Sequence, residues 1–333
     1  MTDAASPIRI LVVEDEAKLA ANIQRGLTEL GFAVETAADG ESGLKRVREV
    51  AYDLVFDTQG LIKTGLVMRM ARLAPGGRRI GLANGTEGSG YEALSRLFHT
   101  ESIAVGCRTH AVARARLVAA GGLGRVAESA ADFMLSPPEV SARAAQWLPP
   151  VPYAVFFHGT ARAAKQWPPA SWIAVGRQLA ARGMPVLLAW GSAEEKRAAA
   201  SLAAQIDGAV VLPSLPMMDA VLLAQRAALV VGVDTGLTHI AAAYCRPTVE
   251  LYCDSPRWKT EGNWSAQIIN LGDRGAPPSV AAVLAAIDTL LADPAVDLAS
   301  APVAAEDAAA DTADDAADDA AADAAAAVTA TRQ

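Results

Sequence analysis

The chain has few aromatic residues, few cysteines and few histidines. Only 5% of its 333 residues are aromatic, and it contains three cysteines and four histidines. Cys107, Cys245 and Cys253 show no metal-ligand spacing, so they are interpreted as buried or incidental thiols in a reducing compartment. Hydrophobic residues make up 52% of the chain, and many of them are alanine. This composition indicates helices that pack through small side chains.

Long apolar runs and an excess of positive charge are also lacking. No run is long and apolar enough to span a bilayer, which predicts no transmembrane segment. The N-terminus lacks the basic region and apolar core of a signal peptide. The net charge is −8, but residues 301–333 alone carry eight acids and one arginine. The remainder is therefore close to neutral, and nothing in it indicates a nucleic-acid-binding surface.

The length allows two α/β domains and a tail. Residues 136–152 contain five prolines, which break helices and suit a linker between domains. From residue 293 the composition falls to alanine, aspartate, valine and threonine, which cannot bury enough apolar surface to fold alone. The predicted division is a first segment (1–55), the remainder of an N-terminal domain (56–135), a linker (136–152), a C-terminal domain (153–292) and a disordered tail (293–333).

The most informative stretch is LVVGVDTGLTHIAAA. Leu229 to Val233 is a β-branched run typical of a buried parallel strand, and Asp234, Thr235 and Gly236 form a turn before a helix. The first N–H groups of a helix have no intrahelical partner, and the helix dipole favours negative charge there. Gly236 lets a ligand approach the backbone. The turn is therefore predicted to hold a phosphorylated ligand.

A second loop of the same kind follows the strand VPYAVFF. It contains His158, Gly159 and Thr160, and Lys165 lies five residues beyond Thr160. In a parallel sheet both loops lie at the carboxyl ends of strands, where ligands bind in such folds. An ammonium group there would stabilise the charge on a departing nucleotide. The alternative interpretation of Lys165 is a solvated helix lysine.

The opening of the chain resembles another family. The stretch ILVVEDEAKLAANIQRGLTELGFAVETAADGESGL is similar to the start of a bacterial response-regulator receiver domain, in which an acidic pair matching Glu14 and Asp15 binds magnesium. Asp57 comes one residue too early for the phosphate acceptor, and such a slip turns a side chain to the other face of a strand. The resemblance covers residues 8–55. A signalling protein switched by phosphorylation remains an alternative that requires Asp57.

From Tyr52 to about Leu291 the chain resembles the lipopolysaccharide heptosyltransferases of glycosyltransferase family 9, best the type that adds the first heptose to Kdo. The matching motifs come in the right order: YDLVFDTQGLIKTGLVMRMA, THAVARARLVAAGGLG, FFHGTARAAKQWPPASWIAVGRQLAARG, LLAWGSAEEKRAAASLAA and VVGVDTGLTHIAAAYCRPTVELYC. The resemblance implies an α/β fold of the GT-B type, with two doubly wound Rossmann-like domains. The first domain would be a chimera with a partial, flavodoxin-like receiver unit.

The resemblance also implies site residues and partners. The donor would be ADP-heptose, with no cofactor and no metal required. The donor-binding residues would be Thr160, Lys165, Glu194 (or its neighbour Glu195), Asp234, Thr235, Gly236, Leu237 and His239. For His239, a packed histidine satisfied by the loop backbone is an equal alternative. The acidic acceptor, Kdo-lipid A, would be bound by the positively charged side chains of Lys63, Arg114 and Arg116. The alternative is that these residues are ordinary surface charges.

The reaction implied is an inverting transfer assisted by Lys165, in the cytoplasm at the inner face of the inner membrane. It needs a base, which in the family is an aspartate of a Gly-Asp motif after the first strand. This motif is missing here, and Asp15 is the carboxylate expected in its place. We therefore predict donor binding with weak or absent turnover. The alternatives are a non-catalytic nucleotide-sugar-binding protein and, from the single DTG triplet, an aspartic protease, which would need two such aspartates on β-rich lobes.

Overall fold

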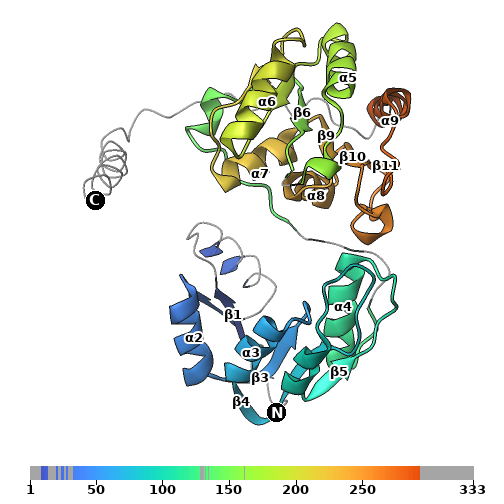
Figure 1. The fold of residues 1–333 in the computed structure, drawn as a ribbon. Coiled ribbons are helices and arrows are strands. Elements are labelled where there is room, and N and C mark those ends of the chain that lie inside the picture. The colour runs from blue at the N-terminus through green and yellow to red at the C-terminus, as the bar shows by residue number, and fades with distance from the viewer. Residues whose placement is uncertain are drawn as a thin grey trace, which may run out of the picture.

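The structure is a computed structural model with two lobes, one above the other in Figure 1. It describes these residues: 9–13, 20–21, 24–25, 28, 33–127, 131, 133, 135–160 and 162–292. The predicted disordered tail and the acidic residues Glu14 and Asp15 lie outside the described residues. The N-terminal lobe contains the elements up to α4, and the C-terminal lobe contains those from β6 onward.

The C-terminal lobe is built on a six-stranded parallel sheet in the order β11-β10-β9-β6-β7-β8. Its strands are β6 (Ala154–Phe157), β7 (Val186–Leu188), β8 (Val210–Val211), β9 (Leu229–Val233), β10 (Thr248–Tyr252) and β11 (Ile268–Gly272). The chain builds outward from β6 in one direction and from β9 in the other. The neighbours β6 and β9 therefore mark the topological switch point, where ligands bind in open α/β sheets.

Helices cover both faces of this sheet, as in a doubly wound fold. They are α5 (Pro169–Ala181), α6 (Ala193–Ala203), α7 (Met217–Arg226), α8 (Gly236–Ala243) and α9 (Val280–Ala292). Alternate residues of β6 face opposite ways: Phe156 packs in the core with Trp172 of α5 and Ile287 of α9, whereas Val155 packs with Leu222 of α7. The predicted linker is part of this core, because its Leu148 is buried in the same cluster as Val155.

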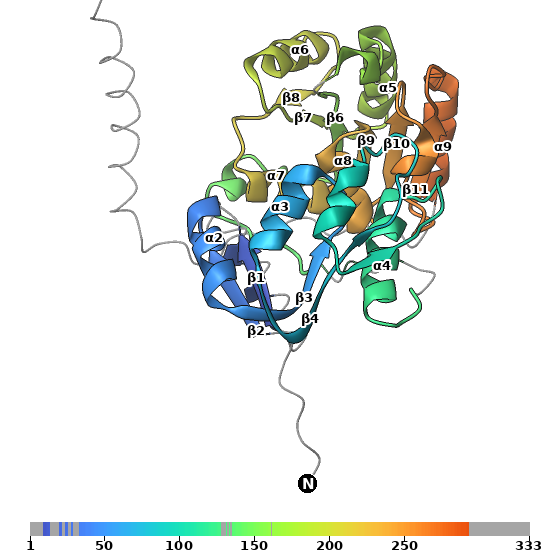
Figure 2. The same ribbon diagram turned by 60° about the horizontal axis from the view of Figure 1, so that its bottom comes forward.

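The described residues of the N-terminal lobe form two small parallel sheets. Strands β3 (Ala51–Asp57), β4 (Arg72–Leu82) and β5 (Glu101–Ile103) form one, and β1 (Arg9–Val13) pairs with β2 (Ala33–Ala37) in the other. The helices that the structure describes from end to end are α2 (Gly40–Glu49), α3 (Ile62–Met70) and α4 (Ala111–Gly122), with the 3-10 helix η1 (Ala93–Phe98) beside α3. Strands β1 and β2 belong to the receiver-like stretch (Figure 2), and within the described residues no strand pairing joins them to β3.

A buried histidine explains why Gly81 occupies the centre of the larger N-terminal sheet. The side chain of His99 is 1% exposed, and its Nε2 lies 4.0 Å from the Asp57 carboxylate. A Cβ on Gly81 would overlap the His99 ring. We expect Gly81→Ala to lower the free energy of unfolding by about 1–3 kcal/mol, because the ring has no room to move aside in a packed core.

Urea unfolding measures this loss, with Gly40→Ala as the matched control. A Cβ on Gly40 meets nothing within 4 Å, so the control should change the free energy of unfolding only slightly. Equal losses in the two variants would contradict the proposed overlap with His99.

Candidate active site

The two loops predicted to bind phosphate meet at the carboxyl edge of the C-terminal sheet. Lys165 belongs to the 3-10 helix η3 (Ala163–Lys165) after β6, and Asp234 directly follows β9. The Lys165 Nζ donates to Asp234 Oδ2 across 2.5 Å, and the side chains are only 19% and 9% exposed. Since β6 and β9 are neighbours with Phe157 paired to Gly232, residues 69 positions apart are brought together here.

The second oxygen of Asp234 is also occupied. His239 Nε2 lies 3.0 Å from Asp234 Oδ1, and the Thr260 hydroxyl donates to the same oxygen at 3.3 Å. His239 Nδ1 lies 3.0 Å from Oε1 of Glu250 on β10. His239 therefore has a carboxylate at each ring nitrogen, which requires it to donate from both.

Glu250 has no exposed surface, and its second oxygen accepts two further hydrogen bonds. The Tyr252 hydroxyl donates to Oε2 at 3.0 Å, and the Gly262 N–H donates to it at 2.9 Å. Burial and the Glu250 charge raise the pKa of Tyr252, so its hydroxyl keeps the proton that it donates. Glu250 is not among the residues predicted from the sequence, although it is a single acid inside the apolar run TVELYC.

These contacts fix the charge of each group. Burial favours a neutral His239, but the hydrogen bonds to Asp234 and Glu250 outweigh it and raise the pKa of His239 to about 9. Burial likewise opposes the charge on Asp234, but hydrogen bonds from His239 and Lys165 hold its pKa well below the ordinary value. The network thus has two anions and two cations at neutral pH. Attraction for a further anion must come from groups beside it.

The start of α8 is one such group. Thr235 is the N-cap residue, and its side chain makes no capping hydrogen bond. The Thr238 hydroxyl instead donates to the Val233 carbonyl at 2.9 Å, against Gly232, where a Cβ would overlap it. At Gly236 a Cβ would meet nothing within 4 Å, so the space before the first backbone N–H groups of the helix is open.

The structure distinguishes the two adjacent glutamates of α6. The Glu195 carboxylate accepts from the Gly191 N–H at 2.7 Å and packs so closely on Gly159 that a Cβ there would overlap it. Glu195 therefore borders the loop that carries Thr160. Glu194, the first choice for the ribose contact, is exposed on α6. The geometry favours Glu195 for that role.

A further cation near this region is Lys259, which belongs to the 3-10 helix η4 (Arg257–Lys259). Lys259 Nζ donates to the Gly88 carbonyl of the N-terminal lobe. Burial lowers the pKa of Lys259, and the charges of Arg114 and Lys165 lower it further. The charges of Arg114 in the N-terminal lobe and Lys165 in the C-terminal lobe therefore both act on Lys259. Lys259 is not among the residues predicted from the sequence, because its position depends on the tertiary fold.

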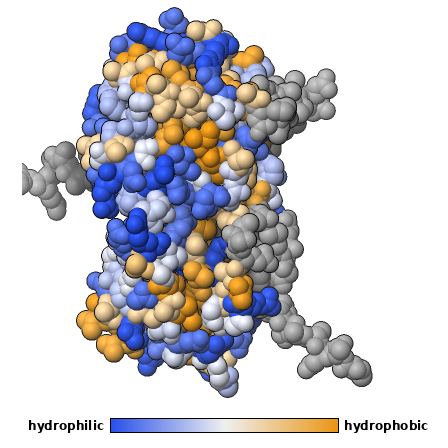
Figure 3. Space-filling model, turned by 90° about the vertical axis from the view of Figure 1, so that its right-hand side faces the viewer, coloured by the Kyte–Doolittle hydropathy of each residue, from blue (hydrophilic) through white to orange (hydrophobic). Residues whose placement is uncertain are grey.

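The segment around η4 is also the contact between the lobes. His110 Nε2, at the start of α4, lies 3.0 Å from the Glu261 carbonyl, and Arg108 stacks 5.1 Å from the Trp258 ring centre. On the face drawn in Figure 3, hydrophilic residues cover much of the waist between the lobes. The cations therefore lie where the two lobes meet.

The remaining predicted acceptor residues lie in the N-terminal lobe. Arg114 donates to the Thr86 hydroxyl at 3.1 Å, Arg116 is half-buried on α4, and Lys63 is exposed on α3. Among the described residues, no hydrogen bond or ion pair joins Lys63 or Arg116 to the Lys165–Asp234 pair. Asp15, the expected base, lies outside the described residues.

Asp57, the residue that a phosphorylation switch would require, is committed to its own loop. Its side chain is buried and accepts from the backbone N–H groups of Gln59 at 2.9 Å and Gly60 at 3.1 Å, and from the Thr64 hydroxyl at 2.9 Å. These bonds shape the turn of the QGLIK motif. A carboxylate held in this way is not presented to a phosphate donor.

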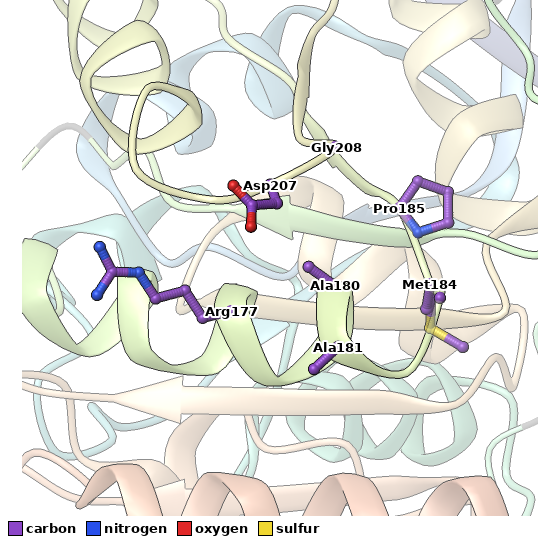
Figure 4. A pocket seen from close by; sticks show the side chains of 8 residues that line it. Arg177, Ala180, Ala181, Met184, Pro185, Asp207 and Gly208 are labelled. Carbon is purple, nitrogen blue, oxygen red and sulfur yellow. The ribbon is translucent and has the colours of Figure 1, made fainter.

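Three further features of the described residues concern metal binding, membrane crossing and cavities. In the part of the chain that the structure describes, no group of three or more histidine, cysteine, aspartate or glutamate side chains could hold a metal ion. None of the described helices has the length and apolar character needed to cross a membrane. A cavity of about 410 Å³ beside Arg177, Pro185 and Asp207 (Figure 4) lies at the amino ends of β7 and β8, opposite the edge where ligands bind.

Comparison with known proteins matches this geometry to a family. Residues 42–283 match the family model for glycosyltransferase family 9 (heptosyltransferase). The chain belongs to glycosyltransferase family 9. The lipopolysaccharide heptosyltransferase 1 of Pseudomonas aeruginosa PAO1 is 38% identical over 211 residues, which are 62% of this chain and 56% of that relative. The chain thus spans little more than half the length of this family 9 relative.

A solved structure supports the predicted fold of this family 9 chain. The Escherichia coli heptosyltransferase WaaC with ADP superimposes with a TM-score of 0.64 at 24% identity, covering 85% of this chain and all of that one. This likeness confirms the GT-B type of α/β fold. A short likeness also exists to the transcriptional regulatory protein TcrA of Mycobacterium tuberculosis H37Rv, 50% identical over 50 residues, or 15% of this chain and 20% of that one.

Proposed function

We propose that the chain transfers heptose from ADP-heptose to the Kdo of Kdo-lipid A, with inversion. The observation that carries the proposal is the Lys165–Asp234–His239 cluster at the topological switch point, beside the open start of α8 and two further cations. The family membership and the heptosyltransferase relative support the choice of donor.

In this proposal the diphosphate lies between the loop of Thr160 and the first N–H groups of α8. Lys165 turns from Asp234 to the phosphates, while Asp234 keeps His239 and Thr260 as partners. The lysine then neutralises the charge that develops as ADP leaves, and such electrostatic stabilisation is usually the largest single contribution to catalysis. Glu195 accepts hydrogen bonds from the ribose hydroxyls.

The acceptor would bind on the N-terminal side. Arg114 is near enough to Lys259 for its charge to lower the pKa of that lysine, so it can hold an acid that approaches the donor; Arg116 and Lys63 lie on the same lobe. Kdo is a carboxylate sugar on a phosphorylated lipid, and arginine binds both groups in bidentate fashion. We place the protein at the cytoplasmic face of the inner membrane, where this acceptor is exposed.

The proposed reaction also needs a base that takes the proton from the acceptor hydroxyl. Asp234 and Glu250 are both paired with His239, and Asp57 is held by three hydrogen bonds. None of these carboxylates can accept a proton from an acceptor hydroxyl without losing a partner. Proton removal would therefore depend on Asp15, whose placement relative to the donor decides the rate.

We expect ADP-heptose to bind while turnover stays at least about a hundredfold below that of an intact family 9 heptosyltransferase, since about 1 Å of misplacement costs that much. Calorimetry with ADP-heptose and a turnover assay with Kdo-lipid A, on the same samples, measure both. Turnover equal to the intact enzyme would contradict the expected impairment, and a failure to bind ADP-heptose would contradict the proposed function. Binding without any turnover would identify the second candidate, a non-catalytic nucleotide-sugar-binding protein.

A further inference from the structure

Helix α3 and the 3-10 helix η1 expose an unusual amount of apolar side chain. Leu66 and Val67 on α3 are 49% and 59% exposed, and Leu94 and Leu97 on η1 are 61% and 77% exposed. Single exposed leucines are common on protein surfaces, but several on adjacent elements mark an interaction site. The proposed donor site uses none of these four residues.

The two helices are held side by side by specific contacts. Gly65 of α3 meets the Phe98 ring so closely that a Cβ would come within 2.5 Å of it. The first N–H of α3, from Ile62, donates to the Glu92 carboxylate at 2.6 Å just before η1 begins. The four apolar side chains therefore belong to one region of the surface rather than to two separate ones.

Helix α3 carries apolar side chains on the side that faces away from the core. Its buried positions are Gly65 and Met68, and Thr64 binds Asp57 beneath the helix. Lys63, Leu66, Val67 and Met70 follow the i, i+3, i+4, i+7 spacing of a single face on the opposite side. On η1, Leu94 and Leu97 share a face because residues three apart align in a 3-10 helix. An ordinary surface helix carries polar side chains at such positions.

The same two helices and the segment just after α3 also carry exposed positive charge. The exposed cations on α3 and at its end are Lys63, Arg69 and Arg72, and η1 carries the exposed Arg96. Neither helix contains an acid, and the nearest one in the sequence, Glu92, already accepts the Ile62 N–H. We call Leu66, Val67, Leu94, Leu97 and these four cations the α3–η1 surface.

We propose that the α3–η1 surface docks the protein on an anionic phospholipid bilayer. Apolar side chains that can enter the headgroup region, together with cations that attract anionic lipids, are the two components of interfacial membrane binding. The proposal rests on the proposed function in one respect. Lys63, expected to bind the lipid acceptor, lies on the same face of α3 as Leu66 and Val67, so docking there would bring the acceptor to the protein.

Vesicle co-sedimentation of the full chain tests the proposal. We expect binding to phosphatidylcholine vesicles that contain phosphatidylglycerol, little binding to pure phosphatidylcholine, and weakening by salt. Leu66→Gln/Val67→Gln and Leu94→Gln/Leu97→Gln should each lower the partition coefficient about tenfold or more. Arg69→Gln/Arg96→Gln should lower it by a similar factor. The matched control is Val126→Gln, which changes a residue that is 92% exposed outside this surface.

Two results would overturn the proposal. One is vesicle binding that is absent, or that the three double variants leave unchanged. The other is sedimentation equilibrium showing a dimer that the leucine variants dissociate, because a second copy of the chain would then cover the surface. ADP-heptose calorimetry on each variant verifies folding. It also separates the two proposals, since vesicle docking stands or fails independently of donor binding.

Discussion

Lys165→Ala is expected to weaken ADP-heptose binding by about one to two orders of magnitude. A hydrogen bond to a charged group contributes about 1.5–3 kcal/mol. The variant removes both the hydrogen bond that Lys165 would donate to a phosphate and the positive charge that would face the diphosphate. The C-terminal lobe should stay folded, because Asp234 keeps His239 and Thr260 as partners. Calorimetric titration with ADP-heptose gives the change in Kd, and circular dichroism verifies the fold.

The matched control is Arg162→Ala, three residues before Lys165. Arg162 is an exposed cation near the same loop, so its removal should weaken binding by only a few-fold. Equal losses in the two variants would mean that general positive charge, rather than the position of Lys165 opposite Asp234, attracts the donor. An unchanged Kd in Lys165→Ala would remove Lys165 from the donor site.

Glu250→Ala is expected to lower the free energy of unfolding by about 3–5 kcal/mol, the usual cost of removing one partner from a buried charged pair. The loss leaves His239 Nδ1, the Tyr252 hydroxyl and the Gly262 N–H without their acceptor. Tyr252→Phe is the control, since it removes one hydrogen bond and no charge and should cost about 1 kcal/mol. Urea unfolding measures both variants, and equal losses would contradict the charged role of Glu250.

The same network is expected to make the free energy of unfolding fall as the pH rises. The pKa of His239 is raised from 6.5 to about 9 in the folded protein, so the folded state binds a proton more tightly than the unfolded state. The resulting stabilisation is fully present below pH 6.5 and is lost as the pH rises through about 9. Glu250→Gln should flatten this decline, because it removes one of the two charges that raise the pKa. An identical pH profile in wild type and Glu250→Gln would show that Glu250 does not set it.

The sequence predicted the central geometry of the candidate site because that geometry follows from strand order and periodicity. Two buried strands, each followed by a small-residue turn, place Lys165 and Asp234 at one edge of a parallel sheet, and the structure brings them into contact. The GT-B fold and the family were also predicted, since several motifs spread along the chain in the right order are far more specific than one motif.

Other parts depend on tertiary contacts that no local pattern encodes. Glu194 and Glu195 are adjacent in sequence, yet a helix turns about 100° per residue, so only Glu195 meets Gly159. Lys259 reaches the site from a loop whose path is set by packing between the lobes. Likewise, no local pattern in β1 and β2 indicates that, among the described residues, they pair with each other and not with β3.

The ion pair between Lys165 and Asp234 also has a consequence for selectivity among anions. A donor that takes Lys165 from Asp234 must compensate for the lost pair, and it can do so only by engaging the α8 amides and the neighbouring cations at the same time. A diphosphate spans these groups, whereas chloride or a single phosphate reaches only part of them. In the proposed donor site, the paired lysine therefore favours a diphosphate over abundant small anions.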